Sequence, residues 1–210
     1  MRRALVLAVL ALPQGLLGQR TIVGNRLVSP ALPKATLEIA AELRYAGTQT
    51  FDLYGVATAE QHLFVALDGD RITRLLWVQF EGYHDSNSNT YNYRDSTLTH
   101  SGQTWHRRIN AVRVPETESR PQSDGARVRA FLRSKGWTLG PDILSERLVW
   151  LLDSPARNEL MVIYMEDLAE QGYAAADLNE GGKGRAFWPG VAQTFHERAL
   201  ASFKVTGARP

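Results

Sequence analysis

The segment from residue 83 to residue 95 has the most distinctive composition in the chain, because its 13 residues include three tyrosines, three asparagines and no aliphatic side chain. Tyrosine offers a flat contact surface at low entropic cost, and asparagine and serine offer adaptable hydrogen bonds. This mixture is typical of binding loops and suits a sugar or another polar ligand, although a hydrophilic connection between two strands has a similar composition. We predict that three rings stack on a ligand and that three polar side chains hydrogen-bond to it: Tyr83, Tyr91 and Tyr93, and Asn87, Asn89 and Arg94.

The same segment contains part of a calcium-loop pattern. Asp85, Asn87 and Asn89 occupy alternate positions, as the first oxygen ligands of such a loop do. The pattern then ends, because Thr90 replaces the turn glycine and Ser96 replaces the bidentate glutamate. We therefore expect no metal site and no cofactor, and we expect the asparagines to form turns with their own backbone. The chain has no cysteine, which excludes disulfides and thiolate metal sites.

A second candidate chemistry is general acid–base catalysis at the rim of the predicted sheet. If the third predicted strand runs past the end of its hairpin, Glu81, His84 and Asp85 approach the turn that holds Glu60. An imidazole beside a carboxylate can transfer protons, so His84, Glu81 and Asp85 are the candidate catalytic residues. Solvated charges at the rim of the sheet are the alternative interpretation.

A sheet must position these residues, and the first half of the chain predicts one. Residues 49–82 read as three strands of an antiparallel meander, and Asp68-Gly69-Asp70 predicts the second turn. In the second and third strands both alternating sets of side chains are apolar, which indicates that both faces of the sheet are covered. Residues 105–114 predict a further strand, and residues 21–28 and 36–45 predict weaker ones.

The second half predicts mainly helices, over residues 123–135, 141–152 and 185–203, with a strand at residues 160–165. A short strand at residues 147–152 is the alternative for the second helix. Glu166 and Asp167, which follow the late strand, are typical of a turn or a helix start. The pattern predicts an α+β fold, in which a curved antiparallel sheet from the N-terminal half is packed on one face by C-terminal helices, with one late strand. We expect a single domain over residues 19–210, strand-rich in 21–114 and helix-rich in 123–203.

The first 18 residues read as a secretory signal peptide. Arg2 and Arg3 precede an apolar run over residues 4–12, which is too short to span a bilayer, and Gly18 is a candidate cleavage position. We therefore expect a periplasmic or secreted protein. The 24 Lys and Arg fall to 22 without the two signal arginines, against 22 Asp and Glu, so the mature chain has no excess of basic residues for binding nucleic acid. It also has no apolar stretch long enough for a membrane span.

Three functions remain open on the sequence. The first is an exported binding module for a polar or amphipathic ligand or a protein partner, which uses the 83–95 segment. The second is a hydrolase or lyase of the cell envelope that uses the His84 cluster. The third is a structural interaction protein without a small-molecule site.

Overall fold

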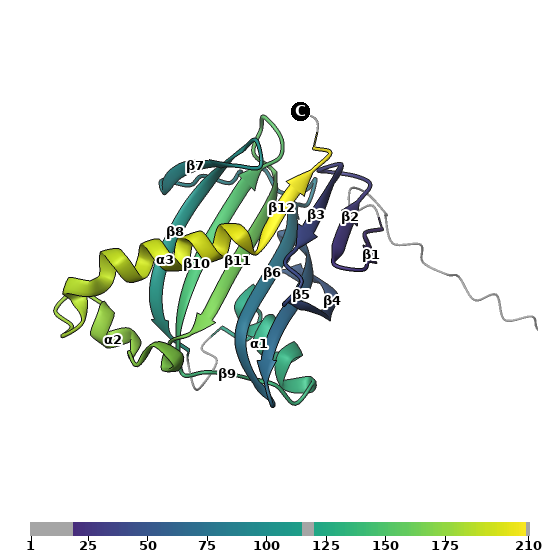
Figure 1. Cartoon of the computed structure of the whole chain (residues 1–210). Helices are drawn as coiled ribbons and strands as arrows, with labels where there is room; N and C mark the ends of the chain where they lie inside the picture. Colours follow the sequence, from purple (N-terminus) through teal and green to yellow (C-terminus); the bar gives the residue numbers. More distant parts are fainter. Residues whose placement is uncertain (1–18, 115–119, 209–210) are drawn as a thin grey trace, which may run out of the picture.

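The computed structural model describes residues 19–114 and 120–208, so the predicted signal peptide, residues 1–18, lies outside the described residues. Figure 1 shows the arrangement of the elements. In chain order they are β1 (Thr21–Val23), β2 (Arg26–Ser29), β3 (Ala35–Ile39), β4 (Arg44–Leu53), β5 (Ala57–Asp68), β6 (Arg71–Tyr83), β7 (Ser96–His100), β8 (Gln103–Arg113), α1 (Asp124–Ser134), β9 (Thr138–Leu139), β10 (Asp142–Leu151), β11 (Asn158–Asp167), the 3₁₀ turn η1 (Leu168–Gln171), α2 (Ala175–Leu178), the 3₁₀ turn η2 (Arg185–Phe187), α3 (Trp188–Ala201) and β12 (Phe203–Thr206).

The strands form two antiparallel sheets. The smaller sheet has the order β1-β2-β3-β12, and the larger has the order β4-β5-β6-β11-β10-β8-β7. The two-residue strand β9 adds a parallel pairing to β6. Strands and helices are thus largely separate along the chain, and the predicted α+β class is confirmed.

The predicted meander is confirmed, since β4, β5 and β6 are consecutive and antiparallel. Gly69 lies at the β5–β6 turn with φ of 60°, a left-handed conformation that glycine adopts without a steric penalty. Nearly all residues in the middle of β5 and β6 are buried, on both alternating sets. The expectation that both faces of the sheet are covered is therefore confirmed.

The helix predicted for residues 141–152 is wrong, because this segment is strand β10. Leu144 and Leu148 are four residues apart, which places them on one face of a helix and equally on one face of a strand. The intervening Glu146 and Trp150 continue the strand alternation, and both flanking strands, β8 and β11, pair with β10 along its length. Strand pairing therefore decided an ambiguous local pattern.

The other helices and the late strand follow their predictions more closely. The Ser123 hydroxyl accepts a hydrogen bond from the Ala126 N–H at 3.2 Å and caps α1. The late strand predicted for residues 160–165 is the centre of β11. The last helix ends at Ala201, so Phe203, expected on its apolar stripe, lies in β12 instead.

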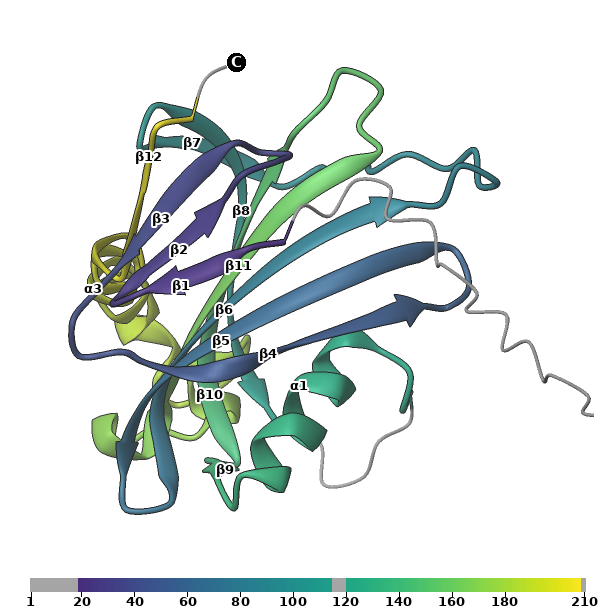
Figure 2. The same ribbon diagram turned by 90° about the vertical axis from the view of Figure 1, so that its right-hand side faces the viewer.

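The helices cover both faces of the larger sheet, whereas the sequence predicted that they lie on one face (Figure 2). Val128 and Leu132 of α1 pack against one face, in a cluster with Leu63 and Trp77. Phe195 and Ala199 of α3 pack against the other face, where the smaller sheet also contributes to the core. Within the described residues, no helix is long and apolar enough to cross a membrane.

Candidate functional site

The predicted binding segment connects β6 to β7, and we call residues 84–95 the tyrosine loop. The loop is anchored to the turn between β10 and β11. The Tyr91 N–H donates to the Ala156 carbonyl at 2.7 Å, and the Arg157 guanidinium donates to the carbonyls of His84 at 2.7 Å and Asn87 at 2.5 Å. These contacts hold both the first and the second half of the loop against the β10–β11 turn.

The rings of the three tyrosines lie together, and the hydroxyl groups of Tyr91 and Tyr93 are directed into the protein. The ring centroids of Tyr83 and Tyr91 are 4.5 Å apart, and the planes of Tyr91 and Tyr93 are almost parallel at a centroid distance of 6.5 Å. The Tyr91 hydroxyl donates to Glu81 at 2.8 Å, and the Tyr93 hydroxyl donates to Glu159 at 2.6 Å. The polar ends of Tyr91 and Tyr93 therefore bind protein carboxyl groups.

Beneath the tyrosines, Glu81 of β6 and Glu159 of β11 face each other as direct cross-strand partners. Glu81 is 9% exposed and Glu159 is 2% exposed. Burial raises the pKa of both carboxyl groups, and the negative charge of Glu81 adds to the effect of burial on Glu159, whose pKa rises to about 8. The Glu159 carboxyl therefore keeps its proton at neutral pH.

A row of glutamines extends from Glu81 across the sheet. The Gln79 amide donates to Glu81 at 2.5 Å, and the Gln61 amide donates to Gln79 at 2.7 Å. Gln49 donates in turn to Gln61 at 2.7 Å. Because every amide in this row donates toward Glu81, the row stabilises the charged form of that carboxylate rather than the protonated form.

We expect Tyr93→Phe to lower the free energy of unfolding by about 1–2 kcal/mol at pH 6, because the buried Glu159 carboxyl loses its hydroxyl donor. The loss is expected to be greater at pH 9, where the ionised carboxylate depends more strongly on that donor. Urea denaturation of both proteins at the two pH values measures the difference.

Tyr54→Phe is the matched control, because Tyr54 is 51% exposed and its replacement is expected to change stability by less than about 0.5 kcal/mol. A Tyr93→Phe variant as stable as the Tyr54→Phe control would show that the hydroxyl contact to Glu159 does not stabilise the fold.

The predicted cluster of His84 with Glu81, Asp85 and Glu60 does not form. His84 Nε2 lies 3.1 Å from the Thr58 hydroxyl and 3.5 Å from Asp52 Oδ2. Glu81 and Glu60 project from opposite faces of the sheet, because neighbouring strands pair Glu60 with Phe80, the residue before Glu81.

The remaining predicted residues of the loop lie toward its outer side. Asp85, Asn89 and Arg94 are exposed. The Asn87 side-chain oxygen accepts from the Asn89 N–H at 2.7 Å, the local turn geometry expected from the sequence. Among the described residues, no group of three or more His, Asp or Glu side chains is placed to hold a metal ion.

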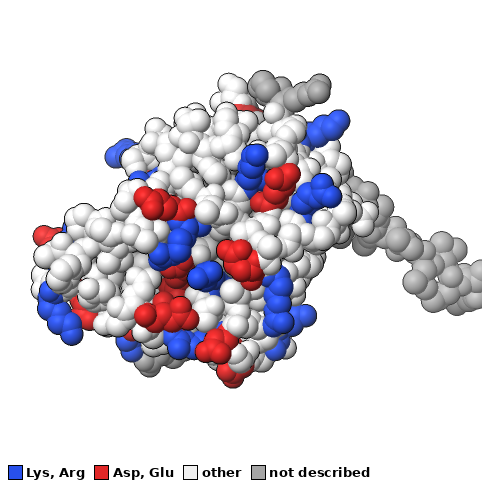
Figure 3. All heavy atoms as spheres, viewed as in Figure 1, with Lys and Arg blue, Asp and Glu red and all other residues white. Residues whose placement is uncertain are grey.

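A polar pocket that the sequence did not predict lies beside α3, on the face of the larger sheet opposite to Glu81 and Glu159. Figure 3 shows basic and acidic side chains close together on this face. The pocket has a volume of about 480 Å³. It is lined by residues of β6, of β11 with η1, and of α3: Thr73 and Arg74; Glu166, Glu170 and Gln171; Gly190, Val191, Thr194 and Arg198.

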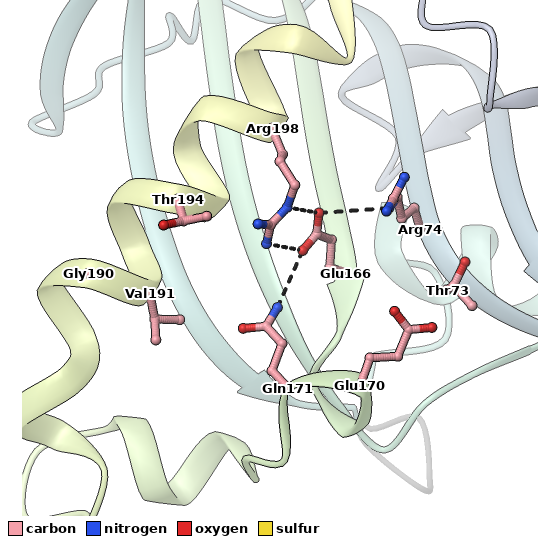
Figure 4. Close-up of a pocket in the computed structure, with 9 residues that line it drawn as sticks. All are labelled: Thr73, Arg74, Glu166, Glu170, Gln171, Gly190, Val191, Thr194 and Arg198. Carbon is pink, nitrogen blue, oxygen red and sulfur yellow. Dashed lines mark hydrogen bonds and ion pairs between the residues drawn. The ribbon is translucent and has the colours of Figure 1, made fainter.

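Glu166 forms the inner wall of this pocket (Figure 4). The Arg198 guanidinium holds it with two parallel contacts, from Nε at 2.7 Å and Nη2 at 2.5 Å. The Tyr164 hydroxyl also donates to it, at 2.7 Å, and Gln171 lies at 3.4 Å. The two parallel contacts make a bidentate ion pair, and the hydrogen bond to Glu166 raises the pKa of Arg198.

Arg74 has a different environment from Arg198. It is the cross-strand partner of Glu166, but its Nε is 4.0 Å from the Glu166 carboxylate, beyond hydrogen-bond distance. No hydrogen bond joins its guanidinium to another described residue, and its side chain is 39% exposed. A guanidinium presents five N–H donors in a planar fork, so Arg74 is available to bind an anionic group.

One local signal for the pocket was present in the sequence, namely the acids that follow the late strand. Asp167 acts as the expected helix-start residue, because its Oδ1 accepts from the Ala169 N–H at 2.9 Å and caps η1. Glu166 enters the pocket instead. Nothing in the sequence around Arg74 or Arg198 indicates their meeting, which results from the pairing of β6 with β11 and from the packing of α3.

Comparisons with known proteins do not identify a relative: no protein-family model matches the chain, and no curated protein or solved structure matches it either.

Proposed function

We propose that this chain is an exported binding protein for a small polar ligand, which it holds in the pocket between β6, η1 and α3. The observation that carries the proposal is Arg74, whose guanidinium lines the pocket without a hydrogen bond to any described residue. The class of ligand agrees with the prediction from the sequence, but the proposed site is the pocket and not the tyrosine loop.

The size and lining of the pocket support binding of a small molecule. A volume of about 480 Å³ falls in the range of roughly 300–1,000 Å³ that is common for ligand sites. Charged and hydroxyl side chains lie around the cavity, while Val191 provides apolar surface. Such a lining favours a ligand with several hydrogen-bonding groups over an apolar one.

The tyrosine loop is a weaker candidate for the same function. The hydroxyl groups of Tyr91 and Tyr93 are hydrogen-bonded to Glu81 and Glu159, so a ligand would have to compete with buried carboxyl groups for them. Arg74 faces no such competition, because its nearest carboxylate already has a bidentate partner in Arg198.

Export is the second part of the proposal and rests on the N-terminal pattern of two arginines followed by an apolar run. An intact-mass measurement of the protein recovered from its native source tests it. A chain that begins near Gln19 supports export, and a chain that retains Met1 or Arg2 contradicts it.

A thermal-shift screen of the folded protein against sugars, amino acids, short peptides and organic acids tests the binding function. A ligand present at 100 times its dissociation constant is expected to stabilise the fold by about 2.7 kcal/mol. The same ligand is expected to produce no shift in Arg74→Ala, because that variant lacks the guanidinium that is proposed to bind it.

Lys34→Ala is the matched control, since Lys34 is an exposed cation outside the pocket, and it is expected to keep the full shift. A ligand whose effect survives Arg74→Ala binds elsewhere. If the whole screen produces no shift, the binding function is wrong.

A further inference from the structure

The charged side chains around the pocket can be sorted by their partners. Arg198 is paired with Glu166, as described above. Arg71 of β6 is paired with Asp167, at 2.6 Å between Nη2 and Oδ2. Each of these two guanidiniums therefore has a hydrogen-bonded carboxylate partner.

Arg74 and Glu170 are the two charged residues of the pocket lining that make no hydrogen bond to a described residue. Both line the pocket; among the described residues Arg74 has a long ion pair with Glu166, at 4.0 Å, and none with Glu170. Glu170 is an exposed residue of η1, whereas Arg74 belongs to β6, so the positive and the negative group approach the pocket from different elements. Figure 4 shows both side chains beside the same space, which Thr73 also lines. The pocket therefore presents one positive and one negative group that make no hydrogen bond to a described residue.

We infer that the ligand is a zwitterion, such as a free amino acid or a short peptide, whose carboxylate binds Arg74 and whose ammonium group binds Glu170. This inference rests on the binding function proposed above. A planar guanidinium matches a carboxylate through two parallel hydrogen bonds, and a carboxylate accepts hydrogen bonds from an ammonium group.

The neighbouring ion pairs favour this ligand class over a simple anion. Glu166 and Glu170 both line the pocket, so a ligand with negative charge alone leaves the Glu170 carboxylate without a hydrogen-bond donor. A ligand with positive charge alone leaves the Arg74 guanidinium without a hydrogen-bond acceptor. A zwitterion gives both groups a hydrogen-bonding partner and leaves the Glu166–Arg198 pair intact.

The side chains between the two charges can complete the recognition. Gln171 donates its amide to Glu166 and has its carbonyl oxygen left to accept a hydrogen bond. Thr194 of α3 is exposed at the pocket wall and offers a hydroxyl group. A peptide group, with one donor and one acceptor, is suited to this part of the pocket.

Isothermal titration calorimetry with four related probes tests the inference. The first is a set of dipeptides with small, aromatic and charged side chains, and the second and third are the same peptides with an acetylated amino group or an amidated carboxyl group. Glucose serves as a neutral polar probe. We expect the free dipeptide to bind, and each modification to weaken binding about tenfold, because each removes one charged hydrogen-bonding partner.

Two pocket variants assign each charge to its partner. In Glu170→Gln we expect acetylation to have no further effect while amidation still weakens binding. In Arg74→Gln we expect amidation to have no further effect while acetylation still weakens binding. Glu180→Gln and Lys34→Gln are the matched controls, because both residues are exposed and lie outside the pocket, and both are expected to behave like the unmodified protein.

The possible results separate this inference from the function on which it rests. If glucose or the acetylated peptide binds as well as the free dipeptide, the protein has a polar site but the zwitterion inference is wrong. The inference is also wrong if both pocket variants keep the full effects of acetylation and amidation. If none of the probes binds and the thermal-shift screen is also negative, the binding function and the inference are both wrong.

Discussion

Glu159→Gln is expected to stabilise the protein at alkaline pH and to leave its stability near pH 5 almost unchanged. Glutamine has nearly the shape of the protonated glutamic acid, and its side-chain oxygen can still accept the hydrogen bond from Tyr93. It cannot ionise, however, so the variant avoids placing a negative charge beside Glu81 in a buried site.

The direction of this effect follows from the pKa of Glu159. Burial and the charge of Glu81 raise that pKa from the ordinary value of 4.5 to about 8 in the folded protein. The folded state therefore binds the proton more tightly than the unfolded state, and the resulting stabilisation is complete below pH 4.5 and is lost as the pH rises toward 8. Each unit of difference between the two pKa values corresponds to about 1.4 kcal/mol, so the protonated Glu159 contributes up to about 5 kcal/mol to the free energy of unfolding.

Chemical denaturation between pH 5 and pH 9 measures the prediction. We expect the free energy of unfolding of the unmodified protein to fall over this interval. The slope of that fall is expected to correspond to the release of one more proton on unfolding than in the variant. Glu180→Gln, which removes an exposed carboxylate, is expected to reproduce the curve of the unmodified protein. Parallel curves for the protein and the Glu159→Gln variant would mean that Glu159 is already ionised in the fold at pH 5.

Replacing Arg20 by methionine is expected to be strongly destabilising. The Arg20 side chain is fully buried, although it lies only one residue before β1. Its guanidinium forms an ion pair with Glu60 at 2.6 Å, donates to the Ser29 hydroxyl at 3.1 Å, and lies over the Phe80 ring at 3.5 Å from the centroid. Arg20 therefore links the smaller sheet to β5 and β6 of the larger sheet.

The expected loss is about 3–5 kcal/mol, because removing one partner of a buried ion pair leaves the other charge without compensation. Burial alone acts to raise the pKa of Glu60, but the hydrogen bond from His62 and the charge of Arg20 outweigh burial and hold this pKa below its ordinary value. Without Arg20, the Glu60 carboxylate keeps only His62, at 2.7 Å, as a partner.

A double variant separates the charge effect from lost packing. Arg20→Met with Glu60→Gln is expected to recover part of the stability that Arg20→Met alone loses at pH 7, because the uncompensated carboxylate is then absent. Arg26→Met is the matched control, since Arg26 is an exposed arginine of β2 in the same sheet. If the double variant is no more stable than Arg20→Met, lost packing and not charge accounts for the effect.

Local patterns were sufficient where a structural element depends on its own residues. The Gly69 turn, the Ser123 cap and the apolar alternation of β5 and β6 are all visible in short windows, and all three are present in the fold. They could be predicted because turn conformation, capping and side-chain alternation act between residues close in the chain.

Local sequence patterns were insufficient where one spacing of apolar residues fits both a helix and a strand. Leu144 and Leu148 satisfy both a helix and a strand, and the choice depends on whether neighbouring strands are available for pairing. The tyrosine loop was recognisable by composition, but the direction of its rings was not. Glu159, which binds the Tyr93 hydroxyl, is far away in the chain and becomes its partner only because β11 lies beside β6.

The sequence by itself determined the α+β class, the meander and the position of an unusual tyrosine-rich segment, because these depend on composition and on spacing between near neighbours. The tertiary structure alone decided that Glu81 faces Glu159, that Arg20 is buried against Glu60, and that Arg74, Glu170 and Arg198 surround one pocket. The physical reason is that sheet pairing and helix packing join residues that are distant in the chain, and the charge, burial and geometry that define a site arise only from those contacts.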